Sequence, residues 1–277
     1  MPNPLALHTW TLDSTPLPEA LAVAKRTGWD AVELRRIDFI RAREAGKTDA
    51  DVWSWVKAAG LAVACVGVEM GWLHAEGPER ARLLGVFAES CATAKAFGCP
   101  RVMSAVGPGQ GEPAASAASV REAAGIAQAL GVRLAFEFAY SAAQLNTLAR
   151  MRELLARAGH PGAGLLLDTY HIVRSGGTAR DVEDVAPSEI VYVQFSDVPR
   201  GALDPKQMLN RLPPGQGVVP FRELFGAFVA KGYTGPFSYE APNPAAWARP
   251  ADEVAREALA ATMQAAAVAL ELEVPAL

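Results

Sequence analysis

Four polar side chains stand where apolar stretches of the chain end. They are Glu137 in LAFEF, Asp168 in GLLLD, Gln194 in VYVQF and Glu240 in FSYE. Burying an amide such as that of Gln194 without a hydrogen-bond partner costs about 1–3 kcal/mol, and three carboxylates gathered together repel one another. A divalent cation would resolve both problems, because it binds carboxylate and amide oxygens. Oxygen donors favour Mn²⁺ or Mg²⁺, with Zn²⁺ less favoured because it more often takes His or Cys.

Four further residues near the same predicted strand ends are candidates for substrate contacts. His171 follows Asp168 by three residues, and its unperturbed pKa of about 6.5 suits proton transfer near neutral pH. His8 and Glu69 lie near the ends of the first and third apolar segments, and Arg200 lies after the seventh. We expect all four to bind substrate. The alternative for each is an ordinary surface, loop or packing position.

Short apolar segments alternate with Ala-rich ones along the chain. We predict strands at 5–10, 31–35, 62–69, 101–106, 132–138, 164–168, 190–195 and 236–240. We predict helices at 17–27, 49–59, 78–97, 114–130, 142–158, 179–185, 221–231 and 250–272. Eight such pairs predict an α/β fold, a single (β/α)₈ TIM barrel over residues 1–277, in which strand carboxyl ends form the active site. A doubly wound open sheet would need a Gly-rich turn after the first strand, and HTWTLDSTPLP has none.

Composition narrows the classes of partner. The net charge of −4 and the lack of a basic stripe argue against nucleic-acid binding. No apolar stretch reaches the roughly 20 residues of a membrane span, and MPNPLALHTWTL does not read as a signal peptide. Three cysteines without a paired spacing indicate reduced thiols. We therefore expect a cytoplasmic protein with a small sugar or polyol substrate, and a homo-oligomer stays open.

Several stretches resemble the sugar phosphate isomerase/epimerase family, also called the xylose isomerase-like TIM barrels. They are GWDAVELR, the Glu of the fifth strand, LLLDTYH, VYVQFSD, LPPGQGVVPF and SYEAPNP. The resemblance implies that Glu137, Asp168, Gln194 and Glu240 are the metal ligands and that His171 faces the substrate or the outer shell of the metal. Ketose 3-epimerases of this family carry a second acid soon after the fifth-strand Glu. The stretch EFAYSAAQLNTLAR has none, which weakens that assignment.

The expected chemistry is isomerisation or epimerisation of a keto-sugar or related polyol through a metal-stabilised enediolate. Glu137 and Glu240 are the expected catalytic pair, one removing the α-proton and the other returning it. If a β-hydroxyl leaves instead, with His171 as the acid, the site becomes a dehydratase or lyase of the 3-dehydroshikimate or inosose type. Cleavage of C-glycosides would use the same chemistry.

Two alternatives belong to other classes. A metal-free barrel that serves as a binding module stays open. An endonuclease IV-like enzyme is excluded, because its several zinc ions need a His-rich site and the chain has only four scattered histidines.

Overall fold

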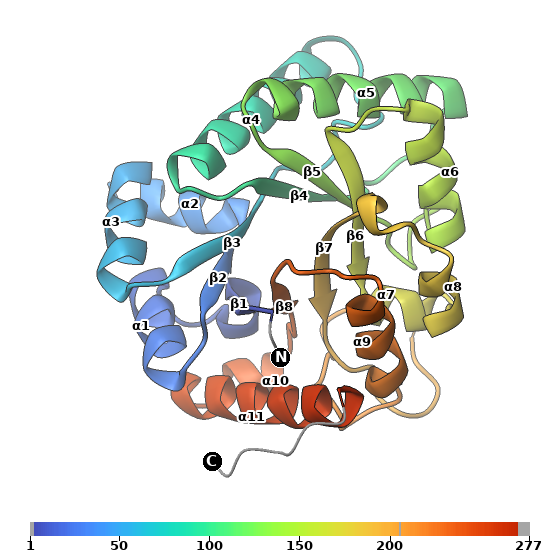
Figure 1. The fold of residues 1–277 in the computed structure, drawn as a ribbon. Helices are drawn as coiled ribbons and strands as arrows, with labels where there is room; N and C mark the ends of the chain where they lie inside the picture. The colour runs from blue at the N-terminus through green and yellow to red at the C-terminus, as the bar shows by residue number, and fades with distance from the viewer. Residues whose placement is uncertain (1–2, 205, 271–277) are drawn as a thin grey trace.

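Eight parallel strands close into a barrel, and helices surround it (Figure 1). The computed structural model describes residues 3–204 and 206–270. The strands pair in chain order, and β8 closes on β1. They are β1 Leu5–His8, β2 Ala31–Leu34, β3 Ala62–Gly67, β4 Arg101–Ala105, β5 Arg133–Glu137, β6 Ala163–Asp168, β7 Ile190–Phe195 and β8 Phe237–Tyr239. The predicted TIM barrel is confirmed.

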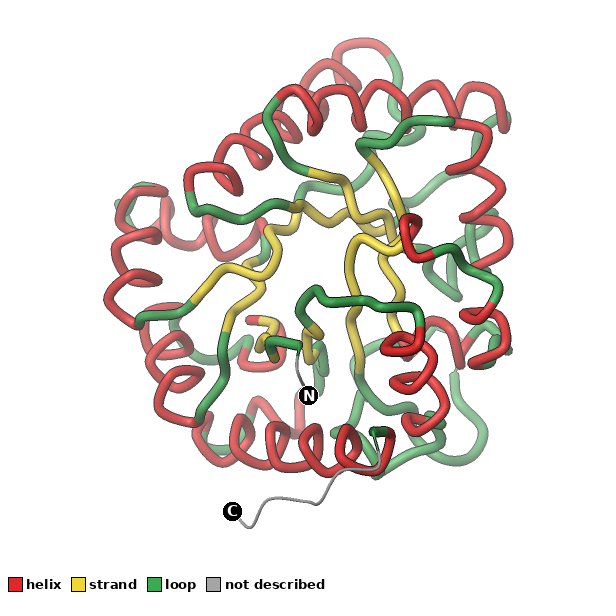
Figure 2. The backbone as a smooth tube through the Cα atoms, in the orientation of Figure 1, coloured by secondary structure: helices red, strands yellow, loops and turns green. Residues whose placement is uncertain are grey.

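The helices form an outer ring around the strands (Figure 2). They are α1 Leu17–Thr27, α2 Arg36–Glu44, α3 Asp49–Ala59, α4 Gly77–Ala96, α5 Pro113–Ala129, α6 Leu148–Ala158, α7 Thr169–Arg174, α8 Ala179–Glu183, α9 Phe221–Ala230, α10 Pro244–Trp247 and α11 Ala251–Ala269. Two 3₁₀ turns, η1 Thr9–Leu12 and η2 Pro187–Glu189, complete the elements. In the part of the chain that the structure describes, no helix is both long and apolar enough to cross a membrane.

Side chains alternate between the two faces of each strand, so that one face packs against helices and the other faces the inside of the barrel. Successive side chains of a strand point to opposite faces. In β7, Phe195 packs outward against Phe225 of α9, with ring centroids 5.4 Å apart. Tyr192 and Gln194 lie on the other face, inside the barrel, where their side chains reach Glu33 of β2 across it. The inward face of β7 therefore carries the polar groups of Tyr192 and Gln194, and its outward face packs against a helix.

Several predicted elements differ from the structure. The helix predicted from residue 142 begins at Leu148, because Thr147 accepts a capping bond from the backbone of Arg150 (3.3 Å). Gln144 meanwhile bonds both backbone groups of Gly111. The first strand ends at His8, whose Nδ1 accepts the backbone N–H of Trp10 (3.1 Å) and turns the chain into η1. The short helices α2, α7 and α10 were not predicted, and residues 271–272 of the last predicted helix lie outside the described residues.

Candidate active site

The strand register brings the four predicted ligand residues to one end of the barrel. Asp168 pairs directly with Gln194 across β6 and β7, and Glu137 at the end of β5 is level with Leu166 of β6. Glu240 follows β8, and its backbone N–H donates to the carbonyl of Phe195 (3.1 Å). All four side chains are buried. Four buried oxygen-bearing groups thus share one rim, as the sequence predicts.

An unpredicted arginine lies between two of these carboxylates. Arg211 is buried, and its Nη1 donates to Asp168 Oδ2 and to Glu240 Oε2, at 2.8 Å each. Burial raises the pKa of Asp168 to about 6, although the charge of Arg211 opposes that rise. One guanidinium can balance the charge of only one of the three carboxyl groups.

The loop that carries Arg211 is held by Asp197, the last residue of VYVQFSD. The backbones of Asp197 and Leu212 form a two-bond antiparallel bridge. The carboxylate of Asp197 also accepts the backbone N–H groups of Gly217 and Val219, at 2.7 and 2.8 Å. A Cβ at Gly217 would collide with the carbonyl oxygen of Val198, which explains a glycine there. Two features of the sequence therefore indicated an ordered loop here: the Asp at the end of VYVQFSD and the segment LPPGQG. Arg211 directly precedes that segment.

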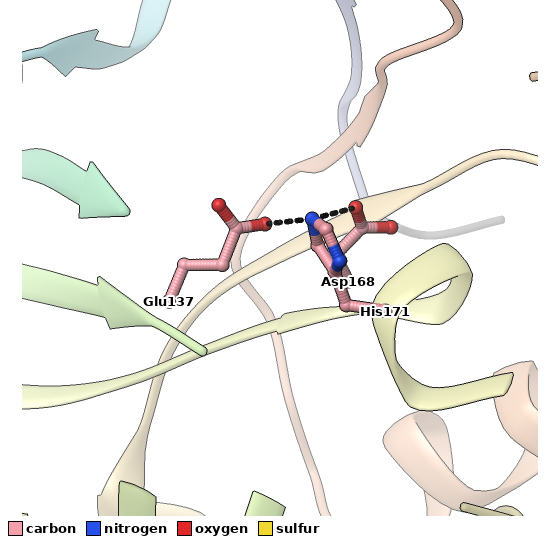
Figure 3. A group of neighbouring side chains, drawn as sticks. All are labelled: Glu137, Asp168 and His171. Atoms are coloured by element: carbon pink, nitrogen blue, oxygen red, sulfur yellow. Dashed lines mark ion pairs between the residues drawn. The ribbon is translucent and has the colours of Figure 1, made fainter. Parts of the chain in front are cut away.

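Figure 3 shows Glu137 and Asp168 directed at the same ring nitrogen of His171. That nitrogen, Nε2, lies 3.7 Å from Glu137 Oε1 and 3.8 Å from Asp168 Oδ2. Nδ1 of His171 lies 3.4 Å from the backbone nitrogen of Tyr140, and Nε2 lies 3.4 Å from Nη2 of Arg211, so each ring nitrogen faces an N–H donor. Burial lowers the pKa of His171 well below its usual value, which keeps the ring neutral. His171 is thus a neutral ring whose Nε2 faces two carboxylates and the guanidinium of Arg211.

A second unpredicted residue, Glu33 of β2, lies fully buried inside the barrel. Its Oε1 accepts the Nε2 of Gln194 (2.9 Å), and its Oε2 accepts the hydroxyl of Tyr192 (3.0 Å). Burial, and then the charge of Glu240, raise the pKa of Glu33 to about 8. His8 Nε2 lies between the two acids, 3.3 Å from Glu240 Oε1 and 3.7 Å from Glu33 Oε1. The amide of Gln194 is therefore oriented by Glu33, a Glu placed in the middle of an otherwise apolar strand.

Two buried oxygens of this cluster lack a hydrogen-bond partner among the described residues, Glu137 Oε1 and Gln194 Oε1. Burial, followed by the charges of Glu240 and Asp168, raises the pKa of Glu137 well above its usual value. Unpartnered oxygens and an excess of carboxylates are what a divalent cation would satisfy, so the donor set fits one.

Glu137, Asp168 and His171 offer an alternative set, since their ligand atoms lie within 4.8 Å of one another. That set needs a lone pair on Nε2 of His171, the nitrogen that the donor Nη2 of Arg211 approaches at 3.4 Å. The observation that favours the all-oxygen set is the amide oxygen of Gln194, which has no partner among the described residues.

A cavity of about 440 Å³ reaches Glu137 and Glu240, whereas Asp168 and Gln194 lie deeper and are not among its lining residues. Its polar lining includes His8, Glu137, His171, Arg211 and Glu240. Apolar lining comes from β3, β4 and the loops that follow them, as well as from Trp10 and Met208. This volume is typical of a site for a small ligand.

Two predicted substrate contacts lie elsewhere. Glu69 is not among the cavity-lining residues, and its carboxylate pairs with Arg82 of α4 at 2.6 Å. Arg200 is exposed and does not line the cavity. The path of the same loop instead brings Arg211 to the cavity, and its role there was not predicted. His8 and His171 do line the cavity, as expected.

Comparisons with known proteins agree with this architecture. The family model for xylose isomerase-like TIM barrels matches residues 21–265. A 3-dehydroshikimate dehydratase of Pseudomonas aeruginosa is 34% identical over 135 residues, which are 48% of this chain and 21% of that protein. The matched segment is thus about a fifth of that relative's length. An inosose isomerase of Halalkalibacterium halodurans is 22% identical over 275 residues, or 95% of this chain and 96% of that one.

Solved structures share the fold. The IOLI protein with a bound zinc atom superposes with a TM-score of 0.86 at 18% identity, covering 95% of this chain and 98% of that one. An L-ribulose 3-epimerase superposes with a TM-score of 0.78 at 21% identity, covering 97% and 96%. The family match spans most of the chain and coincides with a closed eight-stranded barrel. This chain belongs to the xylose isomerase-like TIM barrel family.

Proposed function

We propose that this protein is a divalent-metal-dependent enzyme that moves a proton on the carbon next to a carbonyl, isomerising or epimerising a keto-sugar or related polyol. The observation that carries the proposal is the pair of unpartnered buried oxygens, Glu137 Oε1 and Gln194 Oε1, within a carboxylate cluster. Glu137 and Glu240 of this cluster line a cavity of about 440 Å³. Relatives described as an inosose isomerase and an L-ribulose 3-epimerase support the reaction class.

Glu137, Asp168, Gln194 and Glu240 would hold the cation, with Mn²⁺ or Mg²⁺ preferred for an all-oxygen set. The bound zinc atom of one structural relative supports a divalent cation at such a site without fixing which one. When bound, the cation would act as a Lewis acid that polarises the substrate carbonyl and stabilises the charge of an enediolate.

Glu137 is the proposed base. Its carboxyl faces the cavity, has an oxygen without a partner among the described residues and has a pKa raised by burial. A base with a raised pKa removes a carbon-bound proton more readily. Glu240 reaches the same cavity from β8 and would return the proton. Arg211 holds Glu240 through a 2.8 Å bond and thereby fixes the direction of its carboxylate.

Dehydration by the same site is the second candidate. Nε2 of His171 lies 3.7 Å from Glu137 Oε1, and both residues line the cavity. Because burial keeps the ring of His171 neutral, this route needs His171 to take up a proton before it gives one to the departing β-hydroxyl, once Glu137 has removed the α-proton. The 34% identity to a 3-dehydroshikimate dehydratase over 48% of the chain supports this candidate.

The test is solvent-deuterium exchange at the α-carbon, which reports proton removal whatever the product is. Keto-sugars, inososes, hydroxypyruvate and 3-dehydroshikimate are incubated with the protein, with and without Mn²⁺ or Mg²⁺. We expect exchange on at least one of them, only with the cation, and its loss in Glu240→Gln with the fold intact. The control is Glu122→Gln, a carboxylate of α5 that pairs with Arg80 away from the cavity. No exchange, together with no bound divalent ion by elemental analysis, would favour a binding module instead. The cytoplasmic location and the single-domain extent over residues 1–277 stay predictions.

A further inference from the structure

The two sides of the cavity differ in chemistry. The acidic groups of the site come from β5, from β6 or directly after β8. The other side comes from β3, β4 and the loops that follow them. Ala105 of β4 is level with Glu137 of β5, and Met103 of β4 is level with Gly67 of β3. The wall next to the proposed base is therefore built from an apolar thioether and from two very small residues.

Strand alternation places Met103 and Ala105 inside the barrel. Ser104 between them points outward, where its hydroxyl oxygen accepts the Nε1–H of Trp72 (3.0 Å). Trp72 in turn packs against Phe87 of α4, with ring centroids 5.8 Å apart. Residues 103 and 105 therefore face the opposite way, and both line the cavity. Neither side chain carries a strong hydrogen-bonding group.

Methionines and a tryptophan extend this wall beyond the strands. Three of the six methionines in the chain line the cavity. Met70 is 51% exposed, and among the large apolar side chains that are exposed in the described ranges it alone borders the cavity. Apolar surface left exposed beside a cavity is typical of a ligand site. The apolar wall, as we name it, consists of Trp10, Gly67, Met70, Met103, Ala105 and Met208.

Two arginines that also border the cavity direct their charge elsewhere. Arg35 pairs with Asp13 at 2.7 Å and with Asp38 at 3.2 Å. Nη2 of Arg36 approaches Glu89 (3.9 Å), which does not line the cavity. A polyol placed against the apolar wall would therefore lose water from its hydroxyl groups without gaining hydrogen bonds from the side chains of the wall.

We propose that the apolar wall is a subsite for an aromatic ring, so that the substrate carries such a ring beside the carbonyl group on which the acidic residues act. This inference rests on the proposed function and narrows it. Thioethers make favourable contacts with aromatic rings, and an indole offers a flat face to them. A dry apolar cavity of about 150 Å³ holds benzene. The cavity of about 440 Å³ therefore has room for a ring together with a short polar head.

The experiment uses three ketones that share one hydroxymethyl carbonyl head. On the other side of the carbonyl they carry a methyl, a cyclohexyl or a phenyl group, and only the last is aromatic. Dissociation constants are measured by calorimetry with Mg²⁺ present, for the wild type, Met70→Gln, Met103→Gln and Val268→Gln. Val268 is the matched control, because it is 52% exposed, much like Met70, but lies on α11 outside the cavity. Thermal unfolding confirms that each variant is folded.

We expect the phenyl ketone to bind about 10- to 100-fold more tightly than the methyl ketone, which is the gain from burying one such apolar group. The cyclohexyl ketone should fall in between, because it gains burial without the contacts of sulfur and indole to an aromatic ring. Met70→Gln and Met103→Gln should each reduce the advantage of the phenyl ketone by about two- to tenfold and leave binding of the methyl ketone unchanged. Val268→Gln should bind all three ketones like the wild type.

Three results would overturn the inference: equal binding of the phenyl and methyl ketones by the wild type, a cyclohexyl ketone that binds as tightly as the phenyl ketone, or an undiminished phenyl advantage in both methionine variants. The proposed function fails separately. It fails if neither these ketones nor the compounds named for the exchange experiment exchange an α-proton with either cation, whatever the binding data show.

Discussion

Replacing Glu33 by Leu tests whether this buried acid orients the amide of Gln194 for metal binding. Glu33 accepts the amide N–H at 2.9 Å, and the amide oxygen of Gln194 has no partner in the described part of the chain. Without Glu33 the amide can rotate and present its nitrogen, which cannot bind a cation. Removing a residue that orients a metal ligand typically costs 10- to 100-fold in affinity, or about 1.4–2.7 kcal/mol. We expect a loss of Mn²⁺ affinity of this size.

The substitution also affects folding, and the two effects can be separated. Leu at position 33 leaves the donors of Gln194 and Tyr192 without an acceptor, at about 1–3 kcal/mol each. Thermal unfolding of the metal-free variant measures this cost, and calorimetric Mn²⁺ titration below its unfolding temperature measures affinity. Glu33→Gln keeps an acceptor for Gln194 and should bind Mn²⁺ within about threefold of the wild type. Tyr192→Phe removes the other bond to Glu33 and should bind like the wild type.

A double-mutant cycle decides whether Glu33 acts through Gln194. If it does, Gln194→Leu and the double variant with Glu33→Leu should bind Mn²⁺ equally weakly, because the second change removes nothing more. Additive losses would show that Glu33 acts by another route. If Gln194→Leu binds as tightly as the wild type, Gln194 is not a ligand and the reasoning fails at its first step.

Three further predictions follow from the charges of the site. Arg211→Met should lower the free energy of unfolding of the metal-free protein by about 3–5 kcal/mol, because it leaves Asp168 and Glu240 buried without the guanidinium that pairs with them. Urea unfolding should show a smaller loss when Mn²⁺ is bound. An equal loss with and without Mn²⁺ would speak against a metal ion at these carboxylates. The pKa of Glu33 in the folded protein is raised to about 8 and that of Asp168 to about 6, so the folded chain holds more protons than the unfolded one, and metal-free stability should fall as pH rises from about 4 to 8. Mn²⁺ should offset that fall in a pH series of melting temperatures, and a flat series for the metal-free protein would contradict the assignment. Gln194→His should shift preference from Mn²⁺ to Zn²⁺ by about tenfold or more in a competition titration, with unchanged preference arguing against residue 194 as a ligand.

The fold was predictable because the apolar segments, the Ala-rich segments and the glycines between them all indicate the same alternation of strands and helices. Apolar segments such as IVYVQF alternate with Ala-rich ones, and glycines such as Gly60 end helices in the left-handed conformation (φ 64°). The positions of Glu137, Asp168, Gln194 and Glu240 followed from one rule, that carboxyl ends of parallel strands meet at one rim.

The rest of the site depends on tertiary structure. Arg211 enters the cluster through the path of a long loop, which no periodicity in the sequence specifies. The helix expected from residue 142 begins later because Gln144 bonds Gly111 in a neighbouring loop, and this contact is distant in the sequence. Glu33 was the avoidable omission. It is a charged residue at an inward-facing position of an apolar strand, the same kind of signal that singled out Gln194.

The central claim is that four strand-end oxygen donors hold one divalent cation. Anomalous diffraction from a crystal of the Mn²⁺-loaded protein tests it most directly. We expect one strong peak with oxygens of Glu137, Asp168, Gln194 and Glu240 at about 2.1 Å, a distance typical of a small hard cation, and with His171 Nε2 outside the coordination sphere. A peak bound through His171 in place of Gln194, or no peak at this rim in a crystal soaked to saturation, would contradict the account.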